Sequence, residues 1–120
     1  MSHIVSIQTK VQDLAAIQAA CHRLKLPMPV EGTAKLYSGQ AKGLLLQLPG
    51  WQYPVVIDTA TGNTNFDNYN GAWGEQQKLD AFLQTYAVEK AKIEARKKNL
   101  TVYEKQLQDG SIQLQIQEGY

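Results

Sequence analysis

The chain contains 120 residues, 43% of them hydrophobic, which predicts one globular domain spanning residues 1–120. Its formal net charge is only +1, so no strong overall field favours nucleic acid or an anionic membrane as a partner. A single cysteine excludes an internal disulfide framework, and no stretch approaches the roughly 20 apolar residues that a membrane-spanning helix needs. Because the first residues also lack the pattern of a secretory signal, we expect a reducing compartment, either the cytoplasm or a plastid stroma.

The first quarter of the chain predicts a strand followed by a helix. Apolar and polar side chains alternate over residues 3–11, as in a half-buried strand. Apolar residues then recur every three or four positions, which predicts a helix over residues 13–25 with Asp13 as its N-cap. Pro27 and Pro29 follow, and a helix cannot continue through them.

The middle of the chain is rich in glycine and in short apolar runs, which predicts strands separated by turns. We expect a short, irregular strand near residues 34–37 and two further strands over residues 44–48 and 53–58. The polar segment 64–69 either folds back as another strand or forms an ordered loop.

The last third of the chain predicts a long helix followed by a hairpin. Five apolar residues form one stripe on a helix of roughly twenty residues that begins near Gly74: Leu79, Phe82, Leu83, Tyr86 and Ile93. Strands over 100–103 and 112–116 flank the turn residues 108–111, and this hairpin and the helix are expected to cover each other. The order of elements predicts an α+β fold, with a mainly antiparallel sheet of about five or six strands and both helices on one face. The other face should be partly polar, because glutamines alternate with apolar residues over 112–117.

The segment from Asn65 to Gly71 is rich in Asn and Asp, which invites a calcium-loop interpretation. Aligning Gly71 with the glycine of an EF-hand loop puts Phe66 at the first ligand position and Gln77 where a glutamate is required, so an ordered turn is the better interpretation. Aromatic residues gather in this polar segment, and exposed loop aromatics often anchor protein interfaces. We therefore predict a protein-interaction surface that contains Phe66, Asp67, Tyr69 and Trp73.

Basic residues concentrate near the end of the second helix, namely Lys90, Lys92, Arg96, Lys97 and Lys98. A basic helix end can follow phosphates, and Tyr103 just beyond it is a candidate for stacking on a base. A structural interpretation competes with this one, because cations complement the dipole at a helix C-terminus by roughly 0.3–1 kcal/mol each. Nucleic-acid binding is therefore an alternative hypothesis rather than the leading one.

Motifs for catalysis and cofactor binding are missing from the sequence. The glycines form neither GxGxxG nor a P-loop, no HExxH is present, and no nucleophile elbow occurs. Cys21 lies on the apolar stripe of the first helix, where a cysteine behaves as a small hydrophobe. We expect no cofactor and no metal, and an enzyme with an unrecognised site would have to use His3, Asp67 or Cys21.

Several segments together resemble one protein family. They are Met1-Ser2-His3, the strand ending at Thr9, Asp13-Leu14 at the start of a helix, Trp73-Gly74 before a helix that contains Leu83-Gln84-Thr85-Tyr86-Ala87, and the final run Asp109-Gly110-Ser111-Ile112-Gln113-Leu114. The family is that of hypothetical chloroplast reading frame thirty-five, found in cyanobacteria, red-algal plastids and some other bacteria and phages. The resemblance implies a stand-alone protein from a photosynthetic lineage or its relatives, and it carries over no activity, cofactor or site residue.

The leading hypothesis from the sequence is a non-enzymatic interaction or assembly protein that uses the aromatic loop and the polar face of the sheet. The alternatives are a small nucleic-acid-binding module and an enzyme with an unrecognised site. The last strand, over residues 112–117, has neither a proline nor a cationic residue, so its edge is suited to pairing with a second copy of the chain. A homodimer is therefore a further expectation.

Overall fold

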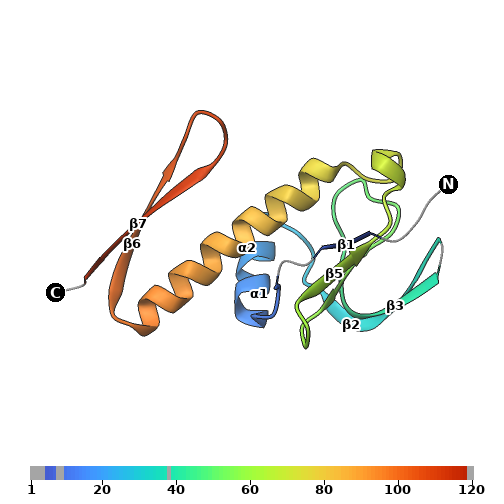
Figure 1. Cartoon of the computed structure of the whole chain (residues 1–120), viewed down its shortest axis with the longest axis horizontal. Coiled ribbons are helices and arrows are strands. Elements are labelled where there is room, and N and C mark those ends of the chain that lie inside the picture. Colours follow the sequence, from blue (N-terminus) through green and yellow to red (C-terminus); the bar gives the residue numbers. More distant parts are fainter. Residues whose placement is uncertain (1–4, 8–9, 38, 119–120) are drawn as a thin grey trace.

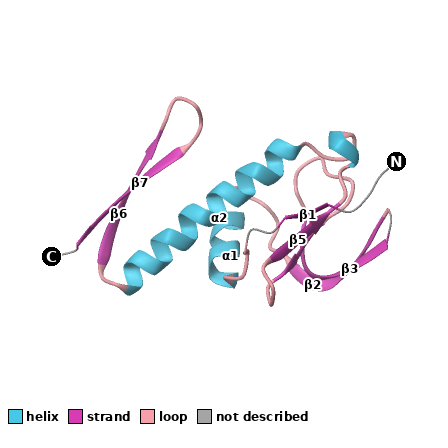
Figure 2. Ribbon diagram, viewed as in Figure 1, coloured by secondary structure: helices cyan, strands magenta, loops and turns pink. Residues whose placement is uncertain are grey.

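The computed structural model describes residues 5–7, 10–37 and 39–118 and shows an α+β fold (Figure 1). Five antiparallel strands form one sheet in the order β1 (Val5–Ile7), β5 (Asn63–Phe66), β4 (Val55–Asp58), β3 (Gly39–Leu46) and β2 (Val30–Leu36). The other elements are the helices α1 (Leu14–Arg23) and α2 (Gln76–Lys97), the 3-10 helix η1 (Tyr69–Gly71), and the strands β6 (Leu100–Gln106) and β7 (Ile112–Glu118). The last two strands form a separate two-stranded sheet, which we call the ribbon (Figure 2).

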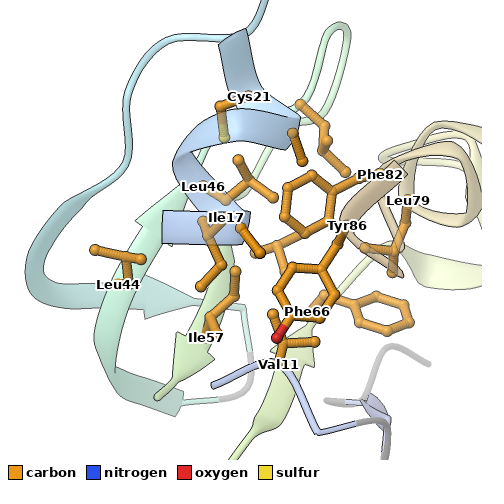
Figure 3. Packing of buried hydrophobic residues seen from close by; sticks show 14 of the residues in the cluster. Val11, Ile17, Cys21, Leu44, Leu46, Ile57, Phe66, Leu79, Phe82 and Tyr86 are labelled. Carbon is orange, nitrogen blue, oxygen red and sulfur yellow. The ribbon is translucent and has the colours of Figure 1, made fainter. Parts of the chain in front are cut away.

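Both helices pack on one face of the five-stranded sheet, as predicted. Leu44 pairs with Ile57 and Leu46 pairs with Val55, so these four side chains point to the same face of β3 and β4. Ile17 and Cys21 from α1 and three residues of the α2 stripe complete this core (Figure 3), namely Leu79, Phe82 and Tyr86. The sequence period therefore identified the residues that hold helices and sheet together.

The N-terminus of α1 is fixed by two kinds of hydrogen bond. The Asp13 carboxylate accepts the N–H of Ala16 at 3.2 Å, which confirms Asp13 as the N-cap. The Tyr86 hydroxyl accepts the N–H groups of Gln12 and Asp13 at 3.2 and 3.1 Å. These N–H groups precede the first turn of α1, so the stripe of α2 also determines where α1 begins.

The structure corrects several expected boundaries. Among the described residues, the first strand covers residues 5–7, and residues 10–11 of the expected 3–11 are not part of it; His3 and residues 8–9 lie outside the described residues. Helix α1 ends at Arg23 rather than at residue 25, because Lys25 adopts a left-handed φ of 58°. The expected short strand at 34–37 is part of a long hairpin that joins β2 to β3.

The strand arrangement also differs from the single sheet that was expected. Seven strands lie within the described residues, and they divide into sheets of five and two. The alternating glutamines of residues 112–117 therefore line a face of the ribbon and not of the main sheet. On the main sheet, the face away from the helices carries a smaller buried cluster of Ala34, Leu36 and Val56. This face is consequently less polar than predicted.

Phe82 provides a direct test of the core. Its side chain is fully buried between α1, α2 and the sheet, so we expect Phe82→Ala to lower the free energy of unfolding by about 3–5 kcal/mol. Urea denaturation followed by circular dichroism measures this loss. Gln77→Ala, at an exposed position of the same helix, should change stability by less than about 0.5 kcal/mol. Equal losses in the two variants would contradict this assignment of the core.

Candidate functional site

Trp73 lies at the centre of a group of aromatic rings beside the start of α2. The ring of Tyr69 stacks on Trp73 with centroids 4.9 Å apart and planes at 23°. The rings of Tyr37 and Tyr53 approach Trp73 at 5.1 and 5.5 Å in tilted and edge-on arrangements. We call these four residues the aromatic cluster. They come from four places in the chain, since Tyr37 follows β2, Tyr53 precedes β4, Tyr69 begins η1 and Trp73 lies before α2.

Asn68 holds the loop that carries two of the four rings. Its backbone carbonyl accepts the N–H groups of Gly71 and Trp73 at 3.0 and 2.9 Å. Its side-chain amide donates to the carbonyl oxygen of Gly74 at 3.3 Å and to the Oε1 atom of Gln76 at 3.2 Å. Asn68 is buried, and its bond to Gly74 is shielded from water. The loop between β5 and α2 is therefore closed around one asparagine.

Trp51 joins the β3–β4 loop to the same region. Its indole Nε1 donates to the carbonyl oxygen of Glu75 at 3.1 Å, and the next residue, Gln52, donates its N–H to the carbonyl oxygen of Trp73 at 2.8 Å. The indole ring packs directly on Gly74, where a Cβ atom would overlap it. This close approach brings Tyr53 beside Trp73.

The aromatic cluster is partly exposed on this fixed support. Tyr37 and Tyr69 have 64% and 40% of their surface exposed, while Tyr53 and Trp73 are half-buried. Such rings offer a large apolar area at a low cost in side-chain entropy, and their polar tips suit a surface that is wet before binding. Chemically, the cluster can stack on or pack against a partner, and it holds no acid–base pair.

Two of the predicted surface residues are in the core instead. Phe66 is 2% exposed, and its ring packs 5.7 Å from that of Trp51. Thr64 pairs with Ile57 across β5 and β4, so Phe66, two residues on, turns toward the helices. Asp67 is fully buried, and neither of its carboxylate oxygens has a hydrogen-bond partner in the described part of the chain. The prediction that Phe66 and Asp67 face a partner is therefore wrong, whereas Tyr69 and Trp73 do lie at the surface.

Sequence reasoning missed Tyr37 and Tyr53. Both were assigned only to strands, and each lies far from Trp73 in the sequence. Tyr37 stands at the end of β2 and Tyr53 precedes Pro54, so both occupy ends of extended segments where exposed aromatic residues occur. That signal marks each residue as a candidate, but it does not show that the two side chains meet at Trp73.

Most of the basic residues near the end of α2 are paired with carboxylates. The Nζ atom of Lys92 lies 2.9 Å from Glu104 and 3.5 Å from Glu89. Lys90 lies 3.9 Å from Asp13, and Lys97 lies 3.6 Å from Glu94. Among the described residues, Arg96 and Lys98 show no ion pair within 4.0 Å. Tyr103, the candidate for stacking on a base, is 54% exposed on the ribbon.

Glu104 of β6 connects the ribbon to both helices. Arg23 of α1 binds its two carboxylate oxygens through two N–H···O bonds of 2.9 Å each, and Lys92 of α2 adds a third contact at 2.9 Å. Arg23 also donates to Glu89 of α2 at 3.1 Å. The hydrogen bonds from Arg23, followed by those from Lys92, lower the pKa of the Glu104 carboxyl. The same bond to Glu104 raises the pKa of Arg23.

Of the three residues considered for an enzyme, the structure describes Cys21 and Asp67, and both are buried. Cys21 is buried, and burial raises the pKa of its thiol to about 11, so little reactive thiolate forms near neutral pH. Asp67 belongs to the core at the end of β5, and His3 lies outside the described residues. Within residues 5–7, 10–37 and 39–118, no group of three or more His, Cys, Asp and Glu side chains could hold a metal ion.

No helix among the described residues is both long and apolar enough to cross a membrane. Comparisons with protein-family models, curated proteins and solved structures gave no match. The resemblance to the family of hypothetical chloroplast reading frame thirty-five therefore stays a prediction from the sequence.

The lowered pKa of Glu104 predicts how the attachment of the ribbon depends on pH. A carboxyl whose pKa is depressed in the folded state stabilises the fold above its unfolded pKa, roughly 4.3, and this contribution disappears as the pH falls through the folded pKa. We expect Glu104→Gln to lower stability by about 0.5–1 kcal/mol at pH 7, the range for surface ion pairs.

Thermal unfolding of the wild type and of Glu104→Gln between pH 7 and pH 2 measures this effect. The difference between the two proteins should shrink below about pH 4.3 and vanish at the lowest pH. Glu94→Gln provides a control, because Glu94 forms an ion pair with Lys97 of the same helix and its side chain is 45% exposed. If the difference in stability between Glu104→Gln and the wild type stays constant with pH, the charge of Glu104 does not hold the ribbon.

Proposed function

We propose that this chain is a non-enzymatic interaction or assembly protein that binds a protein partner through the aromatic cluster. The observation that carries the proposal is the contact of Trp73 with three tyrosines, two of them exposed, on a support held by buried and partly buried hydrogen bonds. Tyrosine and tryptophan are the residue types most enriched among the residues that dominate binding energy at protein interfaces.

The rigidity of the support favours binding over a purely structural role for these rings. Asn68, Trp51 and Gly74 hold the backbone of the loop that carries Tyr69 and Trp73, so this loop loses little further freedom when a partner covers it. The main buried cluster contains Trp51 and Phe66 but no member of the aromatic cluster, while Tyr53 packs against the smaller buried cluster of Ala34, Leu36 and Val56. Exposed aromatic surface outside the main buried cluster suggests an external contact.

The nucleic-acid alternative has weaker support. Three of its five basic residues lie within 4.0 Å of carboxylates, so the local positive charge available to a phosphate is reduced. The remaining cations, Arg96 and Lys98, stand at the C-terminal end of a helix, where they complement its dipole. The aromatic cluster contains no cation.

An affinity experiment with the full chain and two matched variants tests the proposal. The wild type, Tyr37→Ala/Tyr69→Ala and Tyr103→Ala are immobilised and exposed to nuclease-treated native lysate, and retained proteins are identified by mass spectrometry. We expect a partner whose affinity falls at least tenfold for the double variant, since removal of central aromatic anchors typically costs 1–2 kcal/mol or more. Tyr103→Ala removes an equally exposed tyrosine from the ribbon and should bind like the wild type.

The same experiment separates the two hypotheses. Circular dichroism first establishes that the double variant keeps the wild-type fold. Binding that survives loss of Tyr37 and Tyr69 in a folded protein would refute the aromatic cluster as the interface. A parallel capture from lysate without nuclease tests the alternative: nucleic acid that is retained there, and that is lost on replacement of Lys97 and Lys98 by Glu, would support nucleic-acid binding instead.

A further inference from the structure

The ribbon lies apart from the main sheet, at the other end of α2 (Figure 1). The chain measures 54 Å along its longest axis, and its radius of gyration is 15.4 Å, compared with about 13.6 Å for a compact domain of this length. Asn99, with a left-handed φ of 58°, turns the chain from the last residues of α2 directly into β6. An isolated two-stranded sheet is only marginally stable in water, so the ribbon needs other contacts.

The ribbon has one apolar and one polar face. The register pairs Val102 with Ile116 and Glu104 with Leu114, so the apolar side chains gather on a single face: Leu100, Val102, Ile112, Leu114 and Ile116. Helix α2 covers this ribbon in part, with Gln84 Nε2 donating to the carbonyl oxygen of Gly110 at 3.2 Å. However, α2 packs mainly against β6, and Ile116 of β7 remains 51% exposed, whereas Ile112 and Leu114 are half-buried. The apolar face is therefore left open at Ile116.

The register also shows which backbone groups of β7 lack a partner within the ribbon. Leu107 donates its N–H to the carbonyl oxygen of Ser111 at 2.9 Å, next to the pair Gln106 and Ile112. Hydrogen-bonded pairs alternate along an antiparallel ladder, so Gln113, Gln115 and Gln117 point their backbone groups toward β6. The N–H and C=O groups of Ile112, Leu114 and Ile116 consequently point to the free edge.

The two free edges of the ribbon differ in their charge. Strand β6 carries Glu104 and Lys105, and charged residues on an edge strand oppose pairing with another strand. Residues 112–117 of β7 contain neither a charge nor a proline, and the only charge in the strand is Glu118 at its end. Of these two edges, only that of β7 lets a further strand pair along residues 112–117 without facing a charged residue.

We propose that β7 pairs antiparallel with β7 of a second copy, around a two-fold axis that passes by Leu114. This register sets Ile112 opposite Ile116 of the second copy and Gln113 opposite Gln115, so apolar and polar rows each continue across the interface. The product is a four-stranded sheet whose outer strands are the two copies of β6, and their charges stop further growth.

Sedimentation of the full chain over a range of concentrations tests the proposal, with proline placed on either edge. Leu114→Pro removes an N–H that is used only in the dimer, from both copies at once, so the dissociation constant should rise at least about tenfold. Val102→Pro removes the corresponding outward N–H on the β6 edge and should leave the dimer intact. Circular dichroism checks that both variants retain the fold.

A cysteine at the axis tests the register. Residues that face each other in a hydrogen-bonded antiparallel pair have Cα atoms about 5.5 Å apart, which suits a disulfide. Leu114→Cys should therefore form a disulfide between two chains under mild oxidation, whereas Val102→Cys should not. Cys21 is buried with a raised thiol pKa and should remain reduced in both variants. A wild type that stays monomeric at all concentrations, equal loss of dimer in both proline variants, or open-ended fibres would each overturn the proposal.

Discussion

The fold depends on how one row of α2 residues, Leu79, Phe82 and Tyr86, fits between α1 and the five-stranded sheet. These three residues are the buried part of the apolar stripe of α2, and the hydroxyl of Tyr86 fixes the start of α1. A helix of 22 residues is about 33 Å long, whereas five strands span only about 19 Å across a sheet. The helix therefore continues beyond the sheet that it covers (Figure 1), and its second half needs a different partner.

The ribbon supplies that partner, and much of the attachment is electrostatic. Arg23, Lys92 and Glu104 join α1, α2 and β6 through charge-assisted hydrogen bonds of 2.9 Å. Lys92, one of the basic residues near the end of α2, therefore has a structural role in this attachment. A single surface ion pair contributes little to the stability of a protein. Ion pairs contribute most when an arginine binds a carboxylate through two bonds within a network, which here contains four charged residues. The ribbon is thus held at its base, while the outer edge of β7 keeps unpaired backbone groups.

The sequence predicted the features that depend on local pattern. Helical period identified α1 and α2, Asp13 was recognisable as a cap, and the turn around Asp109-Gly110 identified the hairpin. Features that depend on distant pairing were not predictable in the same way. Phe66 looked like a loop residue because its burial follows from the register of β5 on β4. Likewise, Tyr37 and Tyr53 meet Trp73 only because a loop anchored by Trp51 brings together segments that are far apart in the chain.

The aromatic cluster and the β7 edge, if both act as proposed, together give bivalent binding, which neither surface gives alone. The aromatic cluster lies beside the start of α2 and the ribbon follows its end, so pairing through β7 leaves both clusters away from the shared sheet (Figure 1). A dimer built in this way is bivalent, and a partner with two sites would bind the second cluster at a high effective concentration. Avidity of this kind raises apparent affinity by about 10²–10⁴ without any new contact, provided that the spacing of the sites matches. A modest aromatic surface on a small chain could then support stable assembly, and loss of the β7 edge would weaken partner binding without any change in the aromatic cluster.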